Sequence, residues 1–427
     1  MQNWSGYLKW EPSQICYPST ESEIVEIIWN ANEENKKVRI IGSGHSFTPL
    51  CRTDQFLISL DKYQGLISID KEKMLATVKA GTKLNYMNEL LAKNGLALPN
   101  LGDIDVQSIA GAISTGTHGT GINFGNISTD IRKIKLVNGL GEIVECSETD
   151  NKELFKAAQI SLGVLGVLTE ITFQCVPSYS LELTIQNQDL NQILDTYQDL
   201  NQKNRNFEFY WFPHSPYVMT KTSNLSNAAP DKSSFKDYVH EMLLENYTFH
   251  FAMELGYRIP SLSKKISRMA ASTVNPYVKV NESHKVFSTI RTVRFNEMEY
   301  NVPAEAYLHV IKEIIKWFDK NNKDIIFPIE NRFVKGDDIY LSPAFERESA
   351  YIAVHTYHKQ DFKKYFTAME SIFKAHEGRP HWGKMHNLEA DEFDVLYPKF
   401  NLFREIRNRQ DPNGVFMSPY LEQILEM

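Results

Sequence analysis

Several features that define large classes of proteins are scarce in this sequence. It has four cysteines in 427 residues and no Cys-x-x-Cys pair, which excludes zinc-knuckle and dithiol redox sites. Thiols this sparse do not form a disulfide framework, and they favour a reducing compartment. No apolar run reaches the ~18 residues of a membrane span. Residues 1–14 lack a basic and an apolar leader segment, so no signal peptide is expected.

Neither positive nor negative charge is in large excess. The formal net charge is −7 and no basic stripe is visible, which excludes a general nucleic-acid binder. Hydrophobic residues make up 42% of the chain and charged residues 23%, as in ordinary globular proteins. The length predicts two or three domains. We therefore expect a multi-domain protein of the cytoplasm.

A glycine-rich turn follows the first predicted helix and strand. Residues 18–36 have helical spacing and a Thr20–Glu23 capping box, and residues 38–41 form a short apolar run. The next five residues read GSGHS. Glycines at i and i+2 allow a sharp turn that brings backbone amides close to an anion. Phe47 stands where a dinucleotide motif needs its third glycine, so the alternative is a plain strand-to-turn connection.

Two further segments are rich in small residues. Residues 108–121 read SIAGAISTGTHGTG, which lets a large planar or anionic ligand approach the main chain. A solvated loop is the alternative, but the interleaved isoleucines and alanines indicate packing. Residues 163–167 could close over the same ligand or form a tight turn. Other predicted elements are strands at 54–60, 66–70, 75–80, 134–138 and 142–146, and helices at 83–94 and 152–161.

The composition changes after Pro177, where long polar and amphipathic segments begin and glycine becomes scarcer. We place a domain boundary there, between 1–176 and 177–400, with a C-terminal segment at 401–427. Residues 222–285 are polar and irregular, and the sequence assigns them no structure.

Polar side chains recur at strand-like spacing in the second region. In residues 325–334, alternation places Glu330 and Arg332 on one face, either as a structural ion pair or as a polyol-binding pair. In residues 350–358, His355 and Tyr357 share a face and His358 lies on the other, which disfavours a His-x-x-His metal site. Residues 381–384 read HWGK, which alone could be a surface loop.

Together these motifs resemble the vanillyl-alcohol-oxidase-type flavoproteins, and within them the aldonolactone oxidase and alditol oxidase branch. The resemblance lies in GSGHS at 42–46, QSIAGAISTGTHGTG at 107–121, GVLGVLTEITF at 163–173 and HWGK at 381–384, so it spans nearly the whole chain. It implies an α+β, two-domain FAD-binding fold of the PCMH type. The second domain would be a substrate (cap) domain, a mixed sheet with flanking helices, and 401–427 would pack back on the FAD domain.

The resemblance also implies the site residues. FAD would be joined through the flavin 8α carbon to His45, as a single covalent link. The cofactor-binding residues would be Gly42, Ser43, Gly44, His45, Ser46, Gly102, Ser108, Gly111, Ser114, Gly116, His118, Gly119, Gly166 and Val167. Glu330, Arg332, His355 and Lys384 match, in order, the family's Glu-x-Arg strand, the histidine of the next strand and the lysine of H-W-x-K. No metal is implied.

The reaction implied is oxidation of an alcohol carbon of a sugar lactone or polyol, with hydride transfer to flavin N5 and reoxidation by oxygen to hydrogen peroxide. His355 fits the general base most simply, with Lys384 as a second candidate or as a cation near the substrate oxygen. Glu330 would accept substrate hydrogen bonds, and Arg332 would favour the anionic reduced flavin.

Three other functions remain open. One is a dehydrogenase of the same fold that passes electrons to a non-oxygen acceptor. Another is a non-catalytic flavin-binding protein in which Glu330 and Arg332 are only an ion pair. The third is a metal-dependent hydrolase that uses the pairs His355/His358 and His381/His386.

Overall fold

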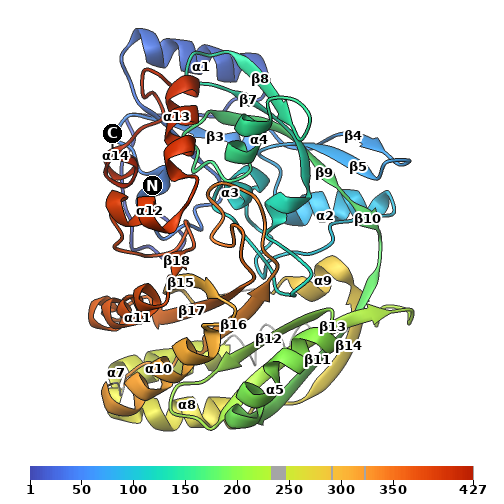
Figure 1. The fold of residues 1–427 in the computed structure, drawn as a ribbon, viewed down its shortest axis with the longest axis vertical. Helices are drawn as coiled ribbons and strands as arrows, with labels where there is room; N and C mark the ends of the chain where they lie inside the picture. The colour runs from blue at the N-terminus through green and yellow to red at the C-terminus, as the bar shows by residue number, and fades with distance from the viewer. Residues whose placement is uncertain (232–246, 290–291, 322–323, 427) are drawn as a thin grey trace.

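The computed structural model describes residues 1–231, 247–289, 292–321 and 324–426 (Figure 1). Residues up to 177 form two main sheets. The smaller has parallel strands in the order β1-β3-β2, and the larger has antiparallel strands in the order β4-β5-β9-β7-β8. The strands are β1 (Gln14–Cys16), β2 (Val38–Ile41), β3 (Phe56–Ser59), β4 (Leu66–Asp70), β5 (Leu75–Lys79), β7 (Ile131–Val137), β8 (Ile143–Ser147) and β9 (Val167–Gln174). A short pair, β6 (Leu96–Ala97) and β10 (Val176–Pro177), adjoins them.

Three helices of this half lie close to their predicted positions: α1 (Glu21–Glu33), α2 (Leu84–Lys93) and α4 (Lys152–Ala158). A fourth helix, α3 (Ile109–Ser114), was not predicted from the sequence. At the start of α1, the Thr20 hydroxyl accepts a hydrogen bond from the Glu23 amide at 3.2 Å. The Glu23 carboxylate, however, accepts from the Ser19 amide at 2.7 Å and not from Thr20, so only half of the expected capping box forms.

The second half is built on one eight-stranded sheet in the order β14-β11-β13-β12-β16-β17-β15-β18. Its strands are β11 (Ser180–Asp189), β12 (Asn206–Trp211), β13 (Tyr217–Ser226), β14 (Tyr277–Glu282), β15 (Phe295–Pro303), β16 (Ile329–Val334), β17 (Ser349–Tyr357) and β18 (Arg379–Pro380). Of the polar region 222–285, residues 232–246 lie outside the described part. The rest forms the end of β13, then α7 (Tyr247–Arg258), α8 (Ser263–Ser272), β14 and α9 (Ser283–Phe287).

The expectation of a mixed sheet was wrong, because every pair of neighbouring strands in this sheet is antiparallel. Helix α5 (Leu190–Lys203) links β11 to β12, but β13 lies between these two strands. Helix α10 (Tyr307–Asn321) likewise links β15 to β16, with β17 between them. A helical crossover makes the linked strands parallel, and the inserted strand keeps them from pairing. The same helix-and-hairpin unit thus occurs twice.

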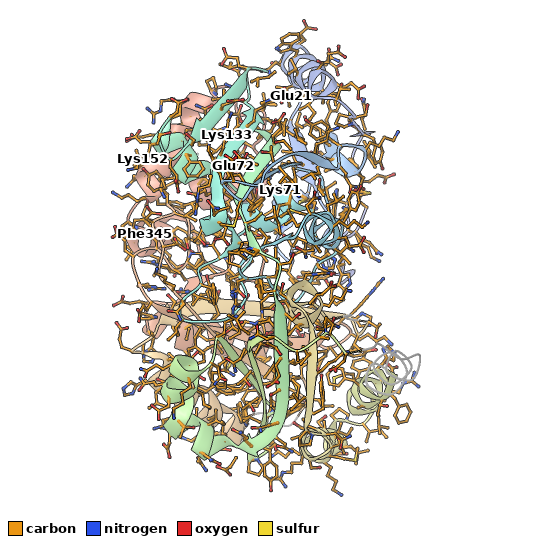
Figure 2. All side chains as sticks on the ribbon, turned by 90° about the vertical axis from the view of Figure 1, so that its right-hand side faces the viewer. Glu21, Lys71, Glu72, Lys133, Lys152 and Phe345 are labelled. Carbon is orange, nitrogen blue, oxygen red and sulfur yellow. The ribbon has the colours of Figure 1, made fainter. Side chains whose placement is uncertain are left out.

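The two faces of the eight-stranded sheet differ in chemistry. Helices α5, α8, α10 and α11 (Lys363–Ala375) cover one face, where buried apolar side chains such as Phe207, Phe209 and Ile352 alternate with the residues of the other face (Figure 1). The other face carries buried charged side chains and is turned toward the first half of the molecule (Figure 1). Charges of both signs, among them Lys71, Glu72 and Lys133, are spread over the outside of the first half (Figure 2).

The end of the described chain returns to the first half as α12 (Ala390–Leu396), α13 (Phe400–Gln410) and α14 (Pro419–Leu425) (Figure 1). The Val38 amide donates to the Val415 carbonyl at 2.8 Å, and the Gly139 amide donates to the Gln410 carbonyl at 2.9 Å. The division of the chain at 176 and 400 stays a prediction. Within the described residues, no helix combines the length and the apolarity that crossing a membrane needs.

Candidate active site

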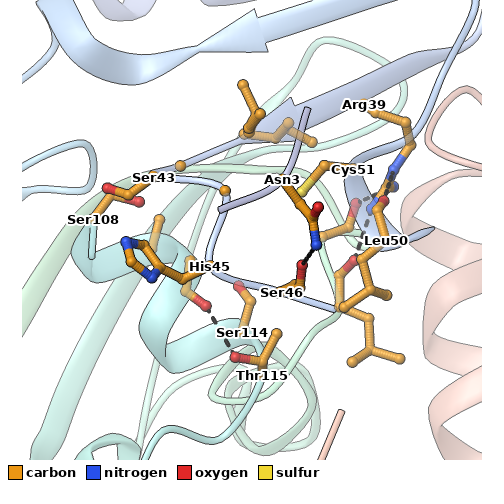
Figure 3. A pocket seen from close by; sticks show the side chains of 18 of the residues that line it. Asn3, Arg39, Ser43, His45, Ser46, Leu50, Cys51, Ser108, Ser114 and Thr115 are labelled. Carbon is orange, nitrogen blue, oxygen red and sulfur yellow. Dashed lines mark hydrogen bonds between the residues drawn. The ribbon is translucent and has the colours of Figure 1, made fainter. Parts of the chain in front are cut away.

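The predicted GSGHS turn leaves the end of β2 and lines a pocket in the first half (Figure 3). Gly44 has a φ of +70°, a conformation that favours glycine, and its carbonyl accepts from the Trp4 amide at 2.7 Å. A Cβ atom on Gly42 would lie 2.1 Å from Ser108 Oγ at the start of α3. The turn therefore packs against α3 so closely that a side chain at Gly42 does not fit.

Nine of the predicted cofactor residues line this pocket, and five do not. Those that line it are Gly42, Ser43, Gly44, His45, Ser46, Ser108, Gly111, Ser114 and Gly166. Gly102, Gly116, His118, Gly119 and Val167 lie outside its lining. Sequence reasoning missed Arg39, which also lines the pocket and is fully buried. Its guanidinium donates to the carbonyls of Leu50, Leu162, Gly163 and Phe416, so it ties three other segments to β2 around the pocket.

The polar groups of this pocket suit a phosphorylated, ring-bearing ligand such as FAD. Among the described residues, the amides of Ser43 to Ser46 have no protein acceptor, so they are available to an anion. Two further lining residues hold buried polar atoms without a partner, Trp10 Nε1 and Gln107 Oε1. Lys83 Nζ lies 3.0 Å from Ser43 Oγ and adds positive charge beside the turn. The residues present therefore fit the cofactor.

His45 lies in this pocket as a neutral imidazole. Burial lowers its pKa to about 4, and the charges of Lys384 and Lys83 act in the same direction. Its ring stacks on Trp4 with centroids 5.7 Å apart. A neutral ring keeps a lone pair at near-neutral pH, which a nucleophile needs.

A row of alternating charges crosses the polar face of the eight-stranded sheet. Arg332 on β16 donates through Nε to Glu208 on β12 at 2.7 Å and through Nη2 to its own strand neighbour Glu330. Lys221 on β13 lies 2.9 Å from Glu208, and the Tyr210 hydroxyl donates to Glu330 at 2.9 Å. The predicted shared face of Glu330 and Arg332 is confirmed, and both side chains are buried.

The pKa values of Glu208 and Arg332 keep these two groups ionised. Burial alone would raise the pKa of Glu208, but the charges of Lys221 and Arg332 outweigh it and hold that pKa below its ordinary value. Burial acts to lower the pKa of Arg332, yet Glu330 and Glu208 outweigh it and raise that pKa. The row therefore offers both fixed acceptors and fixed donors to a hydroxylated molecule.

His355 and Lys384 meet at a carboxylate that sequence reasoning missed. His355 Nε2 lies 3.4 Å from Oε1 of Glu297, and Lys384 Nζ forms an ion pair with Oε2 of the same side chain. Lys384 Nζ also lies 5.3 Å from the centroid of the Phe47 ring, just after the glycine-rich turn. The Phe47 amide donates to the Gly383 carbonyl at 2.7 Å, so residues 383–384 join the sheet face to the pocket.

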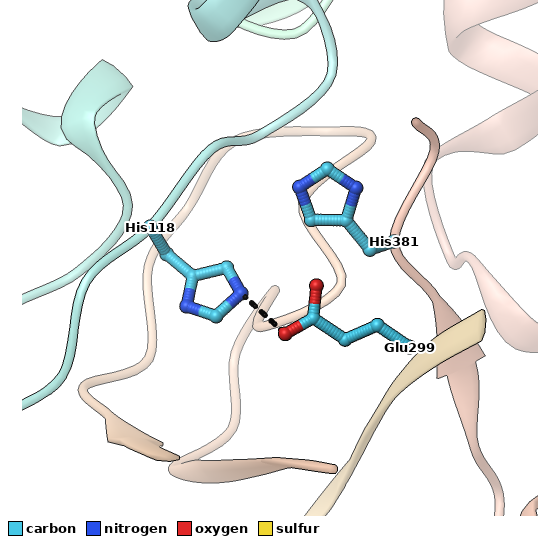
Figure 4. Close-up of side chains that lie close together, drawn as sticks. All are labelled: His118, Glu299 and His381. Carbon is cyan, nitrogen blue, oxygen red and sulfur yellow. Dashed lines mark ion pairs between the residues drawn. The ribbon is translucent and has the colours of Figure 1, made fainter. Parts of the chain in front are cut away.

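A second carboxylate on the same face, Glu299, lies beside two histidines (Figure 4). His118 Nε2 is 3.3 Å from Glu299, and the His118 ring stacks on Tyr351 at 3.6 Å. The third member, His381, accepts the Gly383 amide at Nδ1 (3.0 Å), and burial lowers its pKa to about 3. A neutral ring used in this way carries its hydrogen on Nε2, so His381 offers no free lone pair to a metal. In this cluster His118 of the first half contacts Glu299 of the second half, and this is where the structure places His118.

The histidine pairs of the hydrolase alternative do not converge. His386 Nε2 is 2.9 Å from the Tyr420 hydroxyl, while His381 is held by Gly383. His355 Nδ1 lies 3.1 Å from the Pro328 carbonyl, and His358 follows the end of β17.

The sequence did contain a signal for the two acids that were missed. In FNEMEYN (295–301), Glu297 and Glu299 alternate with Met298 and Tyr300, as expected for a strand with one polar face.

The fold is that of two-domain FAD-binding oxidoreductases of the vanillyl-alcohol-oxidase type. The structure superposes on the crystal structure of cholesterol oxidase from B. sterolicum with a TM-score of 0.83, at 18% identity, over 99% of this chain and 96% of that one. At that identity the likeness shows the fold alone. A family profile for the FAD binding domain matches residues 12–147, which include the glycine-rich turn.

The particular family follows from the second half. The profile of the D-arabinono-1,4-lactone oxidase family matches residues 171–424. L-gulono-1,4-lactone dehydrogenase of Mycobacterium tuberculosis is 37% identical over 99% of this chain and 98% of its own. L-gulonolactone oxidase of Mus musculus is 35% identical over 99% and 97%. The chain belongs to the D-arabinono-1,4-lactone oxidase family and is an FAD-dependent oxidoreductase that acts on CH–OH donors.

Proposed function

We propose that this protein oxidises an alcohol carbon of an aldono-1,4-lactone. The names of its relatives support the substrate class: the M. tuberculosis and mouse proteins are named for gulonolactone, and the Kluyveromyces lactis relative, 25% identical, is named for D-arabinono-1,4-lactone. One observation carries the proposal. Lys384, on the segment that contacts the glycine-rich turn, forms an ion pair on the sheet face that also bears Glu330, Arg332 and His355.

The cofactor residues of the proposal are the nine that line the pocket. Bound FAD supplies the hydride acceptor, and the protein supplies position and charge. The amides of Ser43 to Ser46 would hold the diphosphate. We further propose that His45 is bonded covalently to the flavin, since its imidazole is neutral and lies in the same pocket. For Gly102, Gly116, His118, Gly119 and Val167, a role in cofactor binding stays a prediction.

The substrate residues divide into two groups. Glu330 and Arg332 would bind the hydroxyls of the lactone, because the charged row presents ionised acceptors and donors in fixed positions. His355 and Lys384 would take up the proton of the hydroxyl that is oxidised. The cation that remains would stabilise negative charge near the substrate oxygen.

We propose oxygen as the electron acceptor, with hydrogen peroxide as product. The mouse relative is named an oxidase, which supports this acceptor, whereas the M. tuberculosis relative is named a dehydrogenase. A dehydrogenase that uses another acceptor is therefore the second candidate. The cytoplasmic location also stays a prediction.

Anaerobic mixing of the FAD-loaded protein with L-gulono-1,4-lactone or D-arabinono-1,4-lactone tests the function. The flavin absorbance near 450 nm should bleach with one of the lactones and not with cholesterol. Air is then admitted, and peroxide is measured. Bleaching followed by rapid recovery with peroxide supports the oxidase, bleaching without recovery supports the dehydrogenase, and no bleaching with either lactone contradicts the proposal.

A further inference from the structure

The two candidate proton acceptors share one buried carboxylate. Glu297 lies in the middle of β15 with 5% of its surface exposed, and β15 pairs with β17 so that Glu297 is directly opposite His355. One carboxylate oxygen faces His355 and the other holds Lys384. Within the described residues, Glu297 is the single acid that forms an ion pair with either of them.

The backbone of Glu297 fixes the same neighbours. The Met385 amide donates to the Glu297 carbonyl at 3.0 Å, so the segment that carries Lys384 is bonded to β15 beside the carboxylate. His355 is held from the other side as well, because its Nδ1 lies 3.1 Å from the Pro328 carbonyl. The Pro328 carbonyl and the Glu297 carboxylate can only accept hydrogen bonds. The His355 ring therefore donates to both of them when each of its nitrogens carries a proton.

The charges in this group do not balance. With His355 and Lys384 both protonated, two cations share one anion in a buried place. Burial favours the neutral acid and alone would raise the pKa of Glu297, but Lys384 and His355 outweigh it and lower that pKa, so the carboxylate stays charged. The single carboxylate of Glu297 therefore compensates one cation, so one proton can be exchanged between the pair and the substrate without leaving Glu297 uncompensated.

We propose that Glu297 is a positioning residue that couples His355 to Lys384, so that the three side chains accept the substrate's hydroxyl proton as one unit. This inference rests on the proposed function. In the step, the O–H bond of the substrate breaks and the proton forms a bond with whichever nitrogen of the pair is neutral. Glu297 stabilises the resulting cation and itself keeps its negative charge.

Other ionisable groups face this unit. Glu299 of β15 and His381 of the segment beside β15 act on Glu297, and His45 of the first half acts on Lys384. Lys83 and His118 act in turn on His45 and Glu299. The His355 ring also contacts two apolar rings, with centroid distances of 5.0 Å to Phe295 and 6.0 Å to Phe327. Glu299 contacts His118, whereas Glu297 is the acid that contacts Lys384 and His355 directly.

The test replaces Glu297 and follows the pH dependence of lactone-driven flavin reduction in the FAD-loaded protein. Glu297→Gln removes the anion that favours the protonated forms, so the midpoint of the rate–pH profile should move to lower pH by about one unit or more. The limiting rate should fall by about tenfold or more, because the orientation of the pair is lost. Glu297→Asp keeps the charge at a shorter reach and should return the midpoint most of the way.

Glu370→Gln is the matched control. Glu370 is also a buried acid that contacts β15 and residues near Lys384, through the Tyr300 hydroxyl (2.7 Å) and the Asn387 amide (2.7 Å), but it is not paired with His355 or Lys384. Its removal should leave the midpoint unchanged. An unmoved midpoint in Glu297→Gln, or an equal shift in Glu370→Gln, would overturn the coupling.

A measurement that needs no substrate separates this inference from the proposed function. In protein labelled with ¹³C-histidine, the His355 resonance is identified by its loss in His355→Gln, and its titration is followed with and without Glu297→Gln. A lower midpoint in the variant supports the coupling even if neither lactone bleaches the flavin. An unchanged midpoint refutes it even if both lactones do.

Discussion

The two halves of the molecule present their binding groups in different ways. The pocket of the first half is lined by glycines, small side chains and backbone amides that have no acceptor in the described protein. The sheet face of the second half is lined by charged side chains that are already paired with one another. Binding in the first half therefore depends on the close approach of the main chain to the ligand. Binding in the second half depends on the balance of charges. Substitutions should therefore act through steric overlap in the first half and through uncompensated charge in the second half.

The largest effect should come from removing a central charge of the sheet face. Arg332→Met removes the cation that pairs with the buried acids Glu330 and Glu208, which should cost about 3–5 kcal/mol of unfolding free energy. Urea denaturation of the FAD-loaded protein measures it. Arg404→Met, which breaks the more exposed pair with Asp394, should cost only about 1 kcal/mol. Equal losses in the two variants would show that burial of the row contributes little.

In the first half the decisive change is one of volume. Gly42→Ala places a methyl group 2.1 Å from Ser108 Oγ, and such overpacking costs about 1–3 kcal/mol. FAD content after purification should fall sharply, as read from the ratio of absorbance at 450 and 280 nm. The double variant Gly42→Ala, Ser108→Gly removes the opposing atoms and should recover cofactor. A Gly42→Ala protein with full cofactor would contradict the close approach of the turn to α3.

Acid should weaken the second half through its carboxylates. Although burial alone would raise their pKa values, Lys and Arg partners hold the pKa of Glu208 and of Glu297 below the ordinary 4.5. Their contribution to stability is therefore complete above pH 4.5 and is lost as pH falls through the folded-state pKa values. Each tenfold difference between the folded and unfolded acidity constants of a carboxyl corresponds to about 1.4 kcal/mol of unfolding free energy. Urea midpoints measured from pH 7 to pH 3.5 should fall less steeply in Arg332→Met than in the unmodified protein.

The smallest effect on the fold should come from His45→Ala, which removes the ring but leaves the turn. FAD should still bind, because the amides of the turn remain. After acid precipitation the yellow colour should pass from the pellet to the supernatant, and the intact mass should lack one flavin. Colour in the supernatant of the unmodified protein would refute the covalent bond while leaving the pocket in place.

Much of this arrangement was predictable, because both kinds of site have recognisable local patterns in the sequence. The glycine-rich turn and the packed residues of 108–121 could be recognised from residue size, and the shared face of Glu330 and Arg332 could be recognised from alternation. The partners of the charged residues could not be predicted in the same way. Glu208 and Arg332 are 124 residues apart, and only the order of strands in the sheet brings them together.

The order of the strands was also hidden from sequence reasoning. The resemblance implied a mixed sheet, in which some helices link two strands that are parallel neighbours. The hairpin strands β13 and β17 enter between the linked strands and abolish every parallel pair. The contact between His118 and Glu299 of the other half was hidden in the same way, because the two residues lie on separate segments of the chain.

Arg39 has a consequence for the order in which the molecule can be completed during synthesis. This residue lies beside the pocket of the first half, yet one of its acceptors is the carbonyl of Phe416, and its neighbour Val38 donates to Val415. Domains fold as their residues leave the ribosome, and the N-terminal ones usually finish first. Here the first half is synthesised first, but its packing is completed only by residues that follow the entire second half in the chain. Binding of the cofactor at the completed pocket therefore indicates that both halves have been synthesised and folded.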